Sequence, residues 1–227
     1  MSGGPRPGAA GQAAAMDRMY RFTRHVYDLT RRYYLLGRDR MLAKVPTAAD
    51  TATLEVGCGT ARNLIKLARR PSPGLLCGLD ASHEMLETAA HSIARQGVPA
   101  AGHPPIVLRQ GLAEELDAQR MFGRDEPFDT IFFSYCLSMV PTWPGAIEAA
   151  LANLKPGGRM LIVDFWDQRD LPRWFAAGLK RWLTLFHVEY RPEVHAALEA
   201  LGRSGRADVT FESVASRYAY IATVVKR

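Results

Sequence analysis

The sequence is poor in cysteine and has no long uncharged apolar segment. Three cysteines occur among its 227 residues, without the spacing of a disulfide framework. We therefore expect Cys58, Cys77 and Cys136 to be reduced, buried thiols of a cytosolic protein. The longest uncharged run, residues 130–147, contains two prolines, so it predicts a buried strand and a loop rather than a membrane span.

We also expect neither a metal-ligand cluster nor a signal peptide. The six histidines are scattered along the chain, so we expect no metal site. Residues 1–15 are mainly Gly, Ala and Pro with one Arg and no apolar core, which predicts a disordered tail. A content of 48% hydrophobic and 23% charged residues is typical of one globular domain with a full core.

Positive charge is concentrated near the N-terminus. Residues 16–44 hold eight Lys or Arg against three Asp, whereas residues 45–227 are neutral overall within a net charge of +6. We expect residues 16–44 to be helical. A basic segment in front of a neutral domain indicates an anionic membrane, a nucleic acid or an acidic substrate as partner.

Strand and helix patterns alternate along the rest of the chain. This alternation predicts an α/β fold with a mostly parallel sheet that helices cover on both faces. The expected strands are 51–56, 75–80, 106–109, 128–134, 159–165, 207–212 and 215–225. The expected helices are 60–70, 82–96, 143–153, 172–187 and 191–202, and residues 97–105 form a connector.

A glycine turn follows the first expected strand. Gly57 and Gly59 let the backbone approach a ligand closely, where a Cβ atom would clash. Asp80 ends the second expected strand, at the edge of the sheet where open α/β folds bind their ligands. Because a carboxylate there suits the two hydroxyls of a ribose, the pattern indicates a nucleoside ligand.

Two positions near this turn indicate which nucleoside binds. A dinucleotide fold favours a third glycine where this sequence has Arg62. Glu55 stands two residues before Gly57, and a carboxylate there suits an ammonium group better than a pyrophosphate. These residues favour S-adenosylmethionine (SAM) over a dinucleotide. The glycines alone are also explained by a tight strand-to-helix turn that binds nothing.

Three further segments, residues 128–135, 154–159 and 160–165, carry a family resemblance. In order and spacing they resemble the fourth strand, the Pro-Gly-Gly turn and the fifth strand of class I SAM-dependent methyltransferases. The resemblance runs from about residue 51 to residue 227. It implies a Rossmann-like, mostly parallel seven-stranded sheet with an antiparallel last strand.

The resemblance also implies cofactor contacts in the loops after these strands. They border the methionine moiety (Glu55, Gly57, Cys58, Gly59), the ribose (Asp80), the adenine (Ala81, Met85) and the sulfonium (Ser134, Tyr135). Glu55 faces the ammonium. The family often has an acid where Leu112 stands. Because Leu112 has no acidic side chain, we expect the backbone of Leu112 and Ala113 to contact the adenine instead.

Tyrosines and arginines alternate densely in residues 24–40. The pattern resembles the N-terminus of the N-methyltransferase that makes the betaine lipid diacylglyceryl-trimethylhomoserine, and more loosely that of quinone-biosynthesis C-methyltransferases. This resemblance makes residues 16–44 a helical lid in front of a methyltransferase domain of residues 45–227, with Tyr27 and Arg38 contacting SAM. The alternative is a basic amphipathic helix docked for stability only.

Residues 171–187 form a second segment that bears on the substrate. Tryptophan, phenylalanine and leucine follow helical spacing there, with Arg and Lys among them. Such a helix suits contact with lipid at a membrane interface. The same apolar stripe could instead pack on the sheet as core.

The betaine-lipid resemblance implies three successive N-methylations of diacylglycerylhomoserine, with S-adenosylhomocysteine as the second product. The expected catalytic residues are Tyr27, His25 and Tyr135. The expected substrate-binding residues are Arg24, Arg31, Arg32, Tyr33, Trp166 and Trp182. The expected partners are the lipid, an anionic membrane surface and a separate 3-amino-3-carboxypropyl transferase that supplies the substrate, with no nucleic acid. The protein would be cytoplasmic and peripherally associated with the inner membrane.

Other functions stay open from the sequence. The first is methylation of another amphiphile, either a prenylated quinone precursor or phosphatidylethanolamine. Aminopropyl transfer is disfavoured because the chain lacks the acidic polyamine pocket of that family. A catalytically silent SAM-binding subunit of a membrane complex is disfavoured by the intact Glu55, Gly57, Gly59 and Asp80.

Overall fold

The computed structural model describes residues 35–99, 103–171, 178 and 191–227. The expected tail, residues 16–34 of the expected lid and nearly all of the expected helix 172–187 lie outside the described residues. Within the described part, no helix is long and apolar enough to cross a membrane. The three cysteines are buried and free of disulfides, as predicted.

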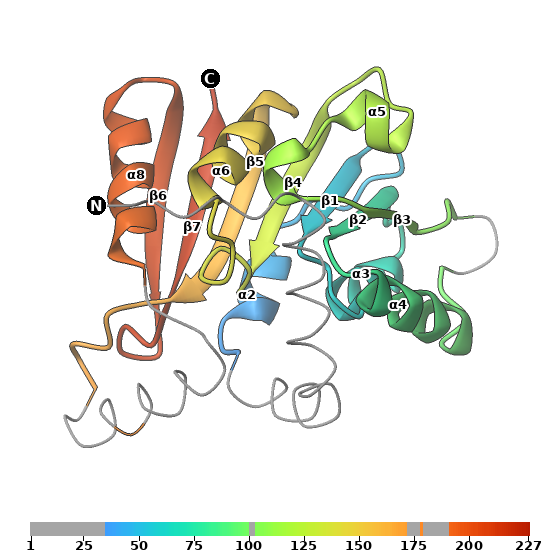
Figure 1. Cartoon of the computed structure of the whole chain (residues 1–227), viewed down its shortest axis with the longest axis horizontal. Helices are drawn as coiled ribbons and strands as arrows, with labels where there is room; N and C mark the ends of the chain where they lie inside the picture. Colours follow the sequence, from blue (N-terminus) through green and yellow to red (C-terminus); the bar gives the residue numbers. More distant parts are fainter. Residues whose placement is uncertain (1–34, 100–102, 172–177, 179–190) are drawn as a thin grey trace, which may run out of the picture.

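The described residues form one seven-stranded sheet (Figure 1). Its strands are β1 Ala52–Val56, β2 Leu75–Asp80, β3 Val107–Gln110, β4 Phe128–Ser134, β5 Leu154–Phe165, β6 Ala207–Val214 and β7 Ala219–Lys226. They lie in the order β3-β2-β1-β4-β5-β7-β6. Strands β1 to β5 pair in parallel, and β7 runs antiparallel to both β5 and β6. The predicted fold class is confirmed, including the antiparallel last strand.

Helices cover both faces of this sheet. In the described part they are α2 Arg38–Leu42, α3 Arg62–Ala68, α4 His83–Arg95, η1 Ala113–Glu115, α5 Ala118–Phe122, α6 Trp143–Ala152 and α8 Pro192–Arg203. Successive side chains of β5 enter different cores. Met160 and Ile162 join a cluster with α6 and α8, whereas Leu161 and Val163 join one with α2, α3 and α4. Burial on both faces explains why the central strands are mostly apolar.

Several elements differ from the sequence prediction, and β7 begins at Ala219 rather than at residue 215. β5 begins at Leu154 rather than at residue 159, because Leu154 already pairs with Phe128 before the register shifts next to the Pro-Gly-Gly turn. Short helices η1 and α5 fill a stretch for which no element was expected. Asp117 caps α5 by accepting a hydrogen bond of 2.7 Å from the backbone N–H of Arg120.

Residues 35–45 are docked on the sheet domain. The side chains of Met41 and Leu42 in α2 are buried in the core. The Arg70 guanidinium donates hydrogen bonds to the carbonyls of Leu42 (2.7 Å) and Val45 (2.9 Å). The C-terminal part of the predicted lid segment is therefore attached to the sheet, and the boundaries of the lid stay a prediction.

Candidate functional site

A pocket lies at the carboxyl ends of β1 and β4, where the strand order reverses. Such a switch point is the usual ligand site of open α/β sheets. Its lining residues are Leu35, Arg38, Glu55, Gly57, Cys58, Thr60, Arg62, Asn63 and Ser134. The structure thus brings together five predicted cofactor contacts: Arg38, Glu55, Gly57, Cys58 and Ser134.

The glycine turn after β1 is tight. Gly57 has φ +72°, and a Cβ atom on it would lie 2.3 Å from the Sγ atom of Cys136. The N–H groups of Gly57 and Cys58 both donate to the carbonyl of Leu79, at 2.8 and 3.0 Å. Glycine is therefore required at position 57 for steric reasons as well as for its backbone conformation.

Asp80, the last residue of the neighbouring strand β2, stabilises this turn. Its side chain is 8% exposed and accepts hydrogen bonds from the N–H groups of Gly59 (2.7 Å) and Ser82 (3.0 Å). A carboxylate can accept several hydrogen bonds, including those from ligand hydroxyls. This arrangement fits the predicted ribose contact.

The pocket carries charges of both signs. Glu55 is 2% exposed and accepts a hydrogen bond of 2.7 Å from the side-chain amide of Asn63. Arg38 and Arg62 line the same pocket. An acid and two guanidinium groups complement the ammonium and carboxylate of an α-amino acid, so these residues fit the methionine end of SAM.

Sequence reasoning missed Asn63 and Arg62 as site residues. Both stand in the first turn of α3, directly behind the glycine turn. Their position in the sequence could have identified them, because side chains in the first helical turn after such a loop can face the preceding strand. Asn63 fixes the orientation of the Glu55 carboxylate, which the sequence alone does not reveal.

The predicted adenine contacts lie beyond the carboxyl ends of β2 and β3. The carbonyl of Ala81 accepts a hydrogen bond of 3.1 Å from Gln110, and Met85 is buried in the first turn of α4. Leu112 and Ala113 form the start of η1. None of these four predicted residues, Ala81, Met85, Leu112 and Ala113, is among the residues that line the pocket, so their adenine role stays a prediction.

Tyr135 is buried beside the pocket. Its backbone has φ +54°, and its hydroxyl donates a hydrogen bond of 2.5 Å to the carbonyl of Leu36. The ring packs edge-on against Phe165 at a centroid distance of 4.7 Å. These contacts assign the side chain a structural role between β4, β5 and the segment before α2, and its predicted role in catalysis stays a prediction.

Trp166 follows β5 and is partly buried by other side chains. His195 stacks against its ring at 5.5 Å, and the Arg217 guanidinium lies 3.8 Å from the ring centroid. These contacts account for the partial burial of the ring, and its predicted role in substrate binding stays a prediction. The other predicted catalytic and substrate residues lie outside the described residues: Arg24, His25, Tyr27, Arg31, Arg32, Tyr33 and Trp182.

Burial raises the pKa of two groups, the Cys58 thiol and the Asp164 carboxyl. Burial, together with the charges of Asp80 and Glu55, raises the pKa of the Cys58 thiol well above its usual value, so Cys58 is a neutral wall of the pocket. Asp164, near the end of β5, accepts hydrogen bonds from the N–H groups of Ser138 (3.0 Å) and Phe165 (2.8 Å). Burial raises the pKa of Asp164 to about 6.

Comparison with known proteins agrees with this geometry. A methyltransferase domain family matches residues 48–203. A phosphatidylethanolamine N-methyltransferase from Cereibacter sphaeroides is 35% identical over 136 residues, which cover 60% of this chain and 60% of that protein. A ubiquinone/menaquinone biosynthesis C-methyltransferase from Geotalea daltonii is 28% identical over 149 residues, covering 63% of this chain and 60% of that protein.

The chain spans about 60% of the length of these curated relatives. Among solved structures it is similar to a SAM-dependent methyltransferase from Aquifex aeolicus, with a TM-score of 0.60 and 16% identity, covering 98% of this chain and 100% of that one. That similarity confirms the predicted Rossmann-like methyltransferase fold. Because the family match extends over most of the chain, the protein belongs to the methyltransferase domain family.

Proposed function

We propose that this protein is a SAM-dependent N-methyltransferase that methylates the amino group of diacylglycerylhomoserine three times, giving diacylglyceryl-trimethylhomoserine. The observation that carries the proposal is the 35% identity with an enzyme named for methylating the amine of a lipid headgroup. The resemblance of residues 24–40 to the betaine-lipid N-methyltransferase supports the more specific substrate.

The pocket supports SAM as the methyl donor. Glu55, oriented by Asn63, is expected to bind the ammonium, and Arg38 or Arg62 the carboxylate of the methionine moiety. Asp80 is expected to bind the ribose hydroxyls. Buried charges are costly without partners, so a zwitterionic ligand suits this lining better than an apolar one.

Methyl transfer requires alignment more than acid–base chemistry. When bound, SAM supplies a methyl group that the deprotonated amine attacks in line, so an N–C bond forms as the S–C bond breaks and its electron pair stays on sulfur. Holding two reactants in this geometry is worth about 7–11 kcal/mol. The protein's residues would therefore act mainly by positioning the amine.

Several side chains are candidates for that positioning. Aromatic faces stabilise a methylated ammonium, and the candidates are Tyr27, Tyr33, Tyr135 and Trp166. The amine's proton would pass to His25, to Asp28 or to water. An arginine could hold the homoserine carboxylate, and the candidates are Arg24, Arg31 and Arg32.

We propose that the enzyme works at an anionic membrane surface, on the cytoplasmic face of the inner membrane. The basic excess in residues 16–44 and the aromatic pattern of residues 171–187 support this location. The headgroup must be built before it is methylated. We propose that a separate 3-amino-3-carboxypropyl transferase builds it.

Phosphatidylethanolamine is the second candidate substrate, because the relative from Cereibacter sphaeroides carries that name. Both candidates present a primary amine on a diacylglyceryl lipid. A quinone precursor is less favoured, because the quinone-biosynthesis relative from Geotalea daltonii is a C-methyltransferase with lower identity, 28%.

Lipid analysis of cells tests the substrate. The chain would be expressed, with and without a headgroup transferase, in a bacterial host that makes no betaine lipid. Mass spectrometry of the lipids should show diacylglyceryl-trimethylhomoserine only when both proteins are present, with the chain carrying Asp80→Ala as inactive control. Methylated phosphatidylethanolamine without the transferase would support the second candidate instead.

A further inference from the structure

Residues 35–38 form one wall of the pocket, although they precede β1 in the chain. Leu35 and Arg38 are among the residues that line the pocket. Leu35 is 7% exposed and belongs to the core cluster that lies with α2, α3 and α4. Arg38, the first residue of α2, is half-buried. The shape of the pocket therefore depends on how this short segment is held against the sheet.

The hydroxyl of Tyr135 joins this wall to the sheet. It donates its hydrogen bond of 2.5 Å to the carbonyl of Leu36, which stands between the two lining residues Leu35 and Arg38. Tyr135 directly follows Ser134, which ends β4 and also lines the pocket. One hydrogen bond thus connects two walls of the pocket that lie 99 positions apart in the sequence.

Contacts in the same core cluster hold Tyr135 in place. Its N–H donates to the carbonyl of Val163 at 2.8 Å, and its ring packs against Phe165. Tyr135, Val163, Phe165 and Leu35 all belong to the cluster with α2, α3 and α4. A residue with a Cβ atom adopts a φ of +54° reluctantly, and such strain is often found at functional sites. The surrounding contacts therefore fix the position of the hydroxyl.

Other polar contacts of residues 35–45 lie on the surface. Arg40 pairs with Glu212 at 2.7 Å, and Asp39 pairs with Lys66 at 2.7 Å. Exposed ion pairs of this kind contribute little to stability. The hydrogen bond from Tyr135 differs from them, because it starts from a buried side chain and reaches the backbone between the two lining residues.

We infer that Tyr135 is a positioning residue for the methionine end of SAM: its hydroxyl holds residues 35–38, and with them Arg38, against the end of β4. The inference rests on the proposed function, because it takes Arg38 to bind the methionine carboxylate. A hydroxyl has one proton to donate, and here the Leu36 carbonyl accepts it. The hydroxyl therefore acts on SAM through the wall that it holds.

Tyr135→Phe removes this hydroxyl and leaves the ring in the core. Calorimetry would give the Kd for SAM and for 5′-methylthioadenosine, which keeps the adenine and ribose of SAM and lacks its amino-acid part. Tyr135→Phe should raise the Kd for SAM about fivefold, because a buried hydrogen bond is lost, and leave the Kd for 5′-methylthioadenosine within about twofold. A merely structural role would weaken the binding of both ligands alike.

A double-mutant cycle with Arg38→Met tests the route through Arg38. Arg38→Met should raise the Kd for SAM about tenfold, because a charge-assisted contact to the carboxylate is lost. In the Arg38→Met background, Tyr135→Phe should add little further loss, because the two side chains act on the same contact. Additive losses would show that the hydroxyl does not act through Arg38.

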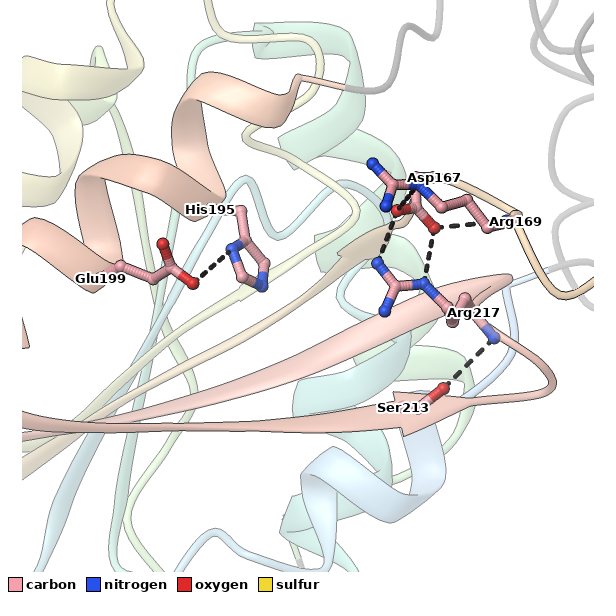
Figure 2. A network of polar contacts seen from close by, with 6 residues as sticks. All are labelled: Asp167, Arg169, His195, Glu199, Ser213 and Arg217. Carbon is pink, nitrogen blue, oxygen red and sulfur yellow. Dashed lines mark hydrogen bonds and ion pairs between the residues drawn. The ribbon is translucent and has the colours of Figure 1, made fainter.

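Two matched controls remove a hydroxyl elsewhere. Tyr220→Phe changes a buried tyrosine of the other core cluster, which lies with α6 and α8. Ser213→Ala removes a hydroxyl that accepts a hydrogen bond of 3.2 Å from the backbone N–H of Arg217 in the hairpin of β6 and β7 (Figure 2). Neither is among the described residues that line the pocket, so neither variant should change the Kd for SAM.

Gly37→Ala covers the case that Tyr135→Phe does not fold. Gly37 has φ +82°, and a Cβ atom on it would lie 3.0 Å from a methyl carbon of Val214. The substitution therefore displaces the same wall while Tyr135 stays intact. It should raise the Kd for SAM and spare 5′-methylthioadenosine in the same way.

An unchanged Kd for SAM in folded Tyr135→Phe would overturn the inference. Equal weakening of SAM and 5′-methylthioadenosine would overturn it as well, and so would additive losses in the cycle with Arg38→Met. No methyl acceptor enters these measurements. A failure of the proposed lipid substrate therefore leaves the test of Tyr135 intact.

Discussion

The carboxylate of Asp80 accepts a hydrogen bond of 2.7 Å from the backbone N–H of Gly59. This contact ties the end of β2 to the glycine turn after β1, although 21 positions separate the two residues. The same side chain that is expected to bind the ribose therefore also shapes the loop around the methionine moiety. Loss of Asp80 should affect both functions.

Asp80→Ala should weaken SAM binding by about 1.5–3 kcal/mol, the range for a hydrogen bond to a charged group. Calorimetry with SAM measures the change. Asp208→Asn is the control, because that carboxylate pairs with Arg227 on the surface and should leave SAM affinity unchanged. Unchanged affinity in Asp80→Ala, or tight binding of NAD by wild type, would contradict the cofactor assignment.

Gly57→Ala and Gly123→Ala separate a steric clash from backbone strain. Both glycines have positive φ, +72° and +63°, so both variants pay about 1–2 kcal/mol for a left-handed alanine. Only at Gly57 would the new Cβ meet a neighbour, Cys136, whereas Gly123 has nothing within 4 Å. Gly57→Ala should therefore lose about 1–3 kcal/mol more.

Urea unfolding of both variants gives the two free energies, and Gly57→Ala should also bind SAM more weakly. Adding Cys136→Ala should restore part of its stability, because the smaller side chain makes room for the Cβ atom. Equal destabilisation at the two positions would show that the turn tolerates a side chain.

Asp164 gives the protein a pH-dependent stability. Burial raises the pKa of Asp164 from 3.8 to about 6, so the folded state holds this proton more tightly than the unfolded state. Stability from this group is therefore lost as the pH rises from about 4 to about 6, by about 3 kcal/mol in total. Asp164→Asn should remove that loss.

The comparison uses the free energy of unfolding in urea at about pH 4.5 and at pH 7. The change in the free energy of unfolding from about pH 4.5 to pH 7 should be more stabilising in Asp164→Asn than in wild type. Carboxylates whose pKa is lowered by ion pairs, such as Asp167 with Arg217, contribute equally to both proteins. Parallel pH profiles would mean that Asp164 is ionised at little cost.

Binding to anionic vesicles should weaken as salt is added. Each Lys or Arg near the surface contributes about 1 kcal/mol, and salt screens this attraction. Trp182→Glu should reduce vesicle binding even at low salt while keeping SAM affinity, because an apolar contact is lost. Co-sedimentation with anionic and with neutral phosphatidylcholine vesicles measures both effects.

Absence of binding to anionic vesicles at low salt would remove the membrane proposal. If Trp182→Glu lowers the melting temperature instead of vesicle binding, the apolar stripe of residues 171–187 is core.

Local pattern was sufficient to predict most of the fold. The strands ending at Val56, Asp80 and Ser134 were located within one residue of their observed bounds, because each is a buried apolar run that a turn or a polar residue ends. The start of β5 and helices η1 and α5 were missed. Their formation depends on tertiary contacts, such as the pairing of Leu154 with Phe128, that no short window of sequence contains.

Site residues at the carboxyl ends of strands were predicted from the sequence. Site contacts that depend on how different segments pack together were missed. Glu55, Gly57 and Ser134 reach the pocket because each lies at or near the carboxyl end of a strand. Asn63 contacts Glu55 from the helix behind the glycine turn, and the stack of Trp166 with Arg217 joins segments that are far apart in the chain. Sequence alone gives no register between such segments.

The most direct test of the account is methyl transfer by the purified protein to vesicles with defined acceptors. SAM carrying a deuterated methyl group would be supplied with diacylglycerylhomoserine, phosphatidylethanolamine or a demethylated quinone, each at equal mole fraction in anionic vesicles. We expect diacylglycerylhomoserine to gain up to three labelled methyl groups on nitrogen, with the highest kcat/KM of the three. A higher kcat/KM for phosphatidylethanolamine or for the quinone would contradict the account. Absence of labelling on all three acceptors would contradict it as well.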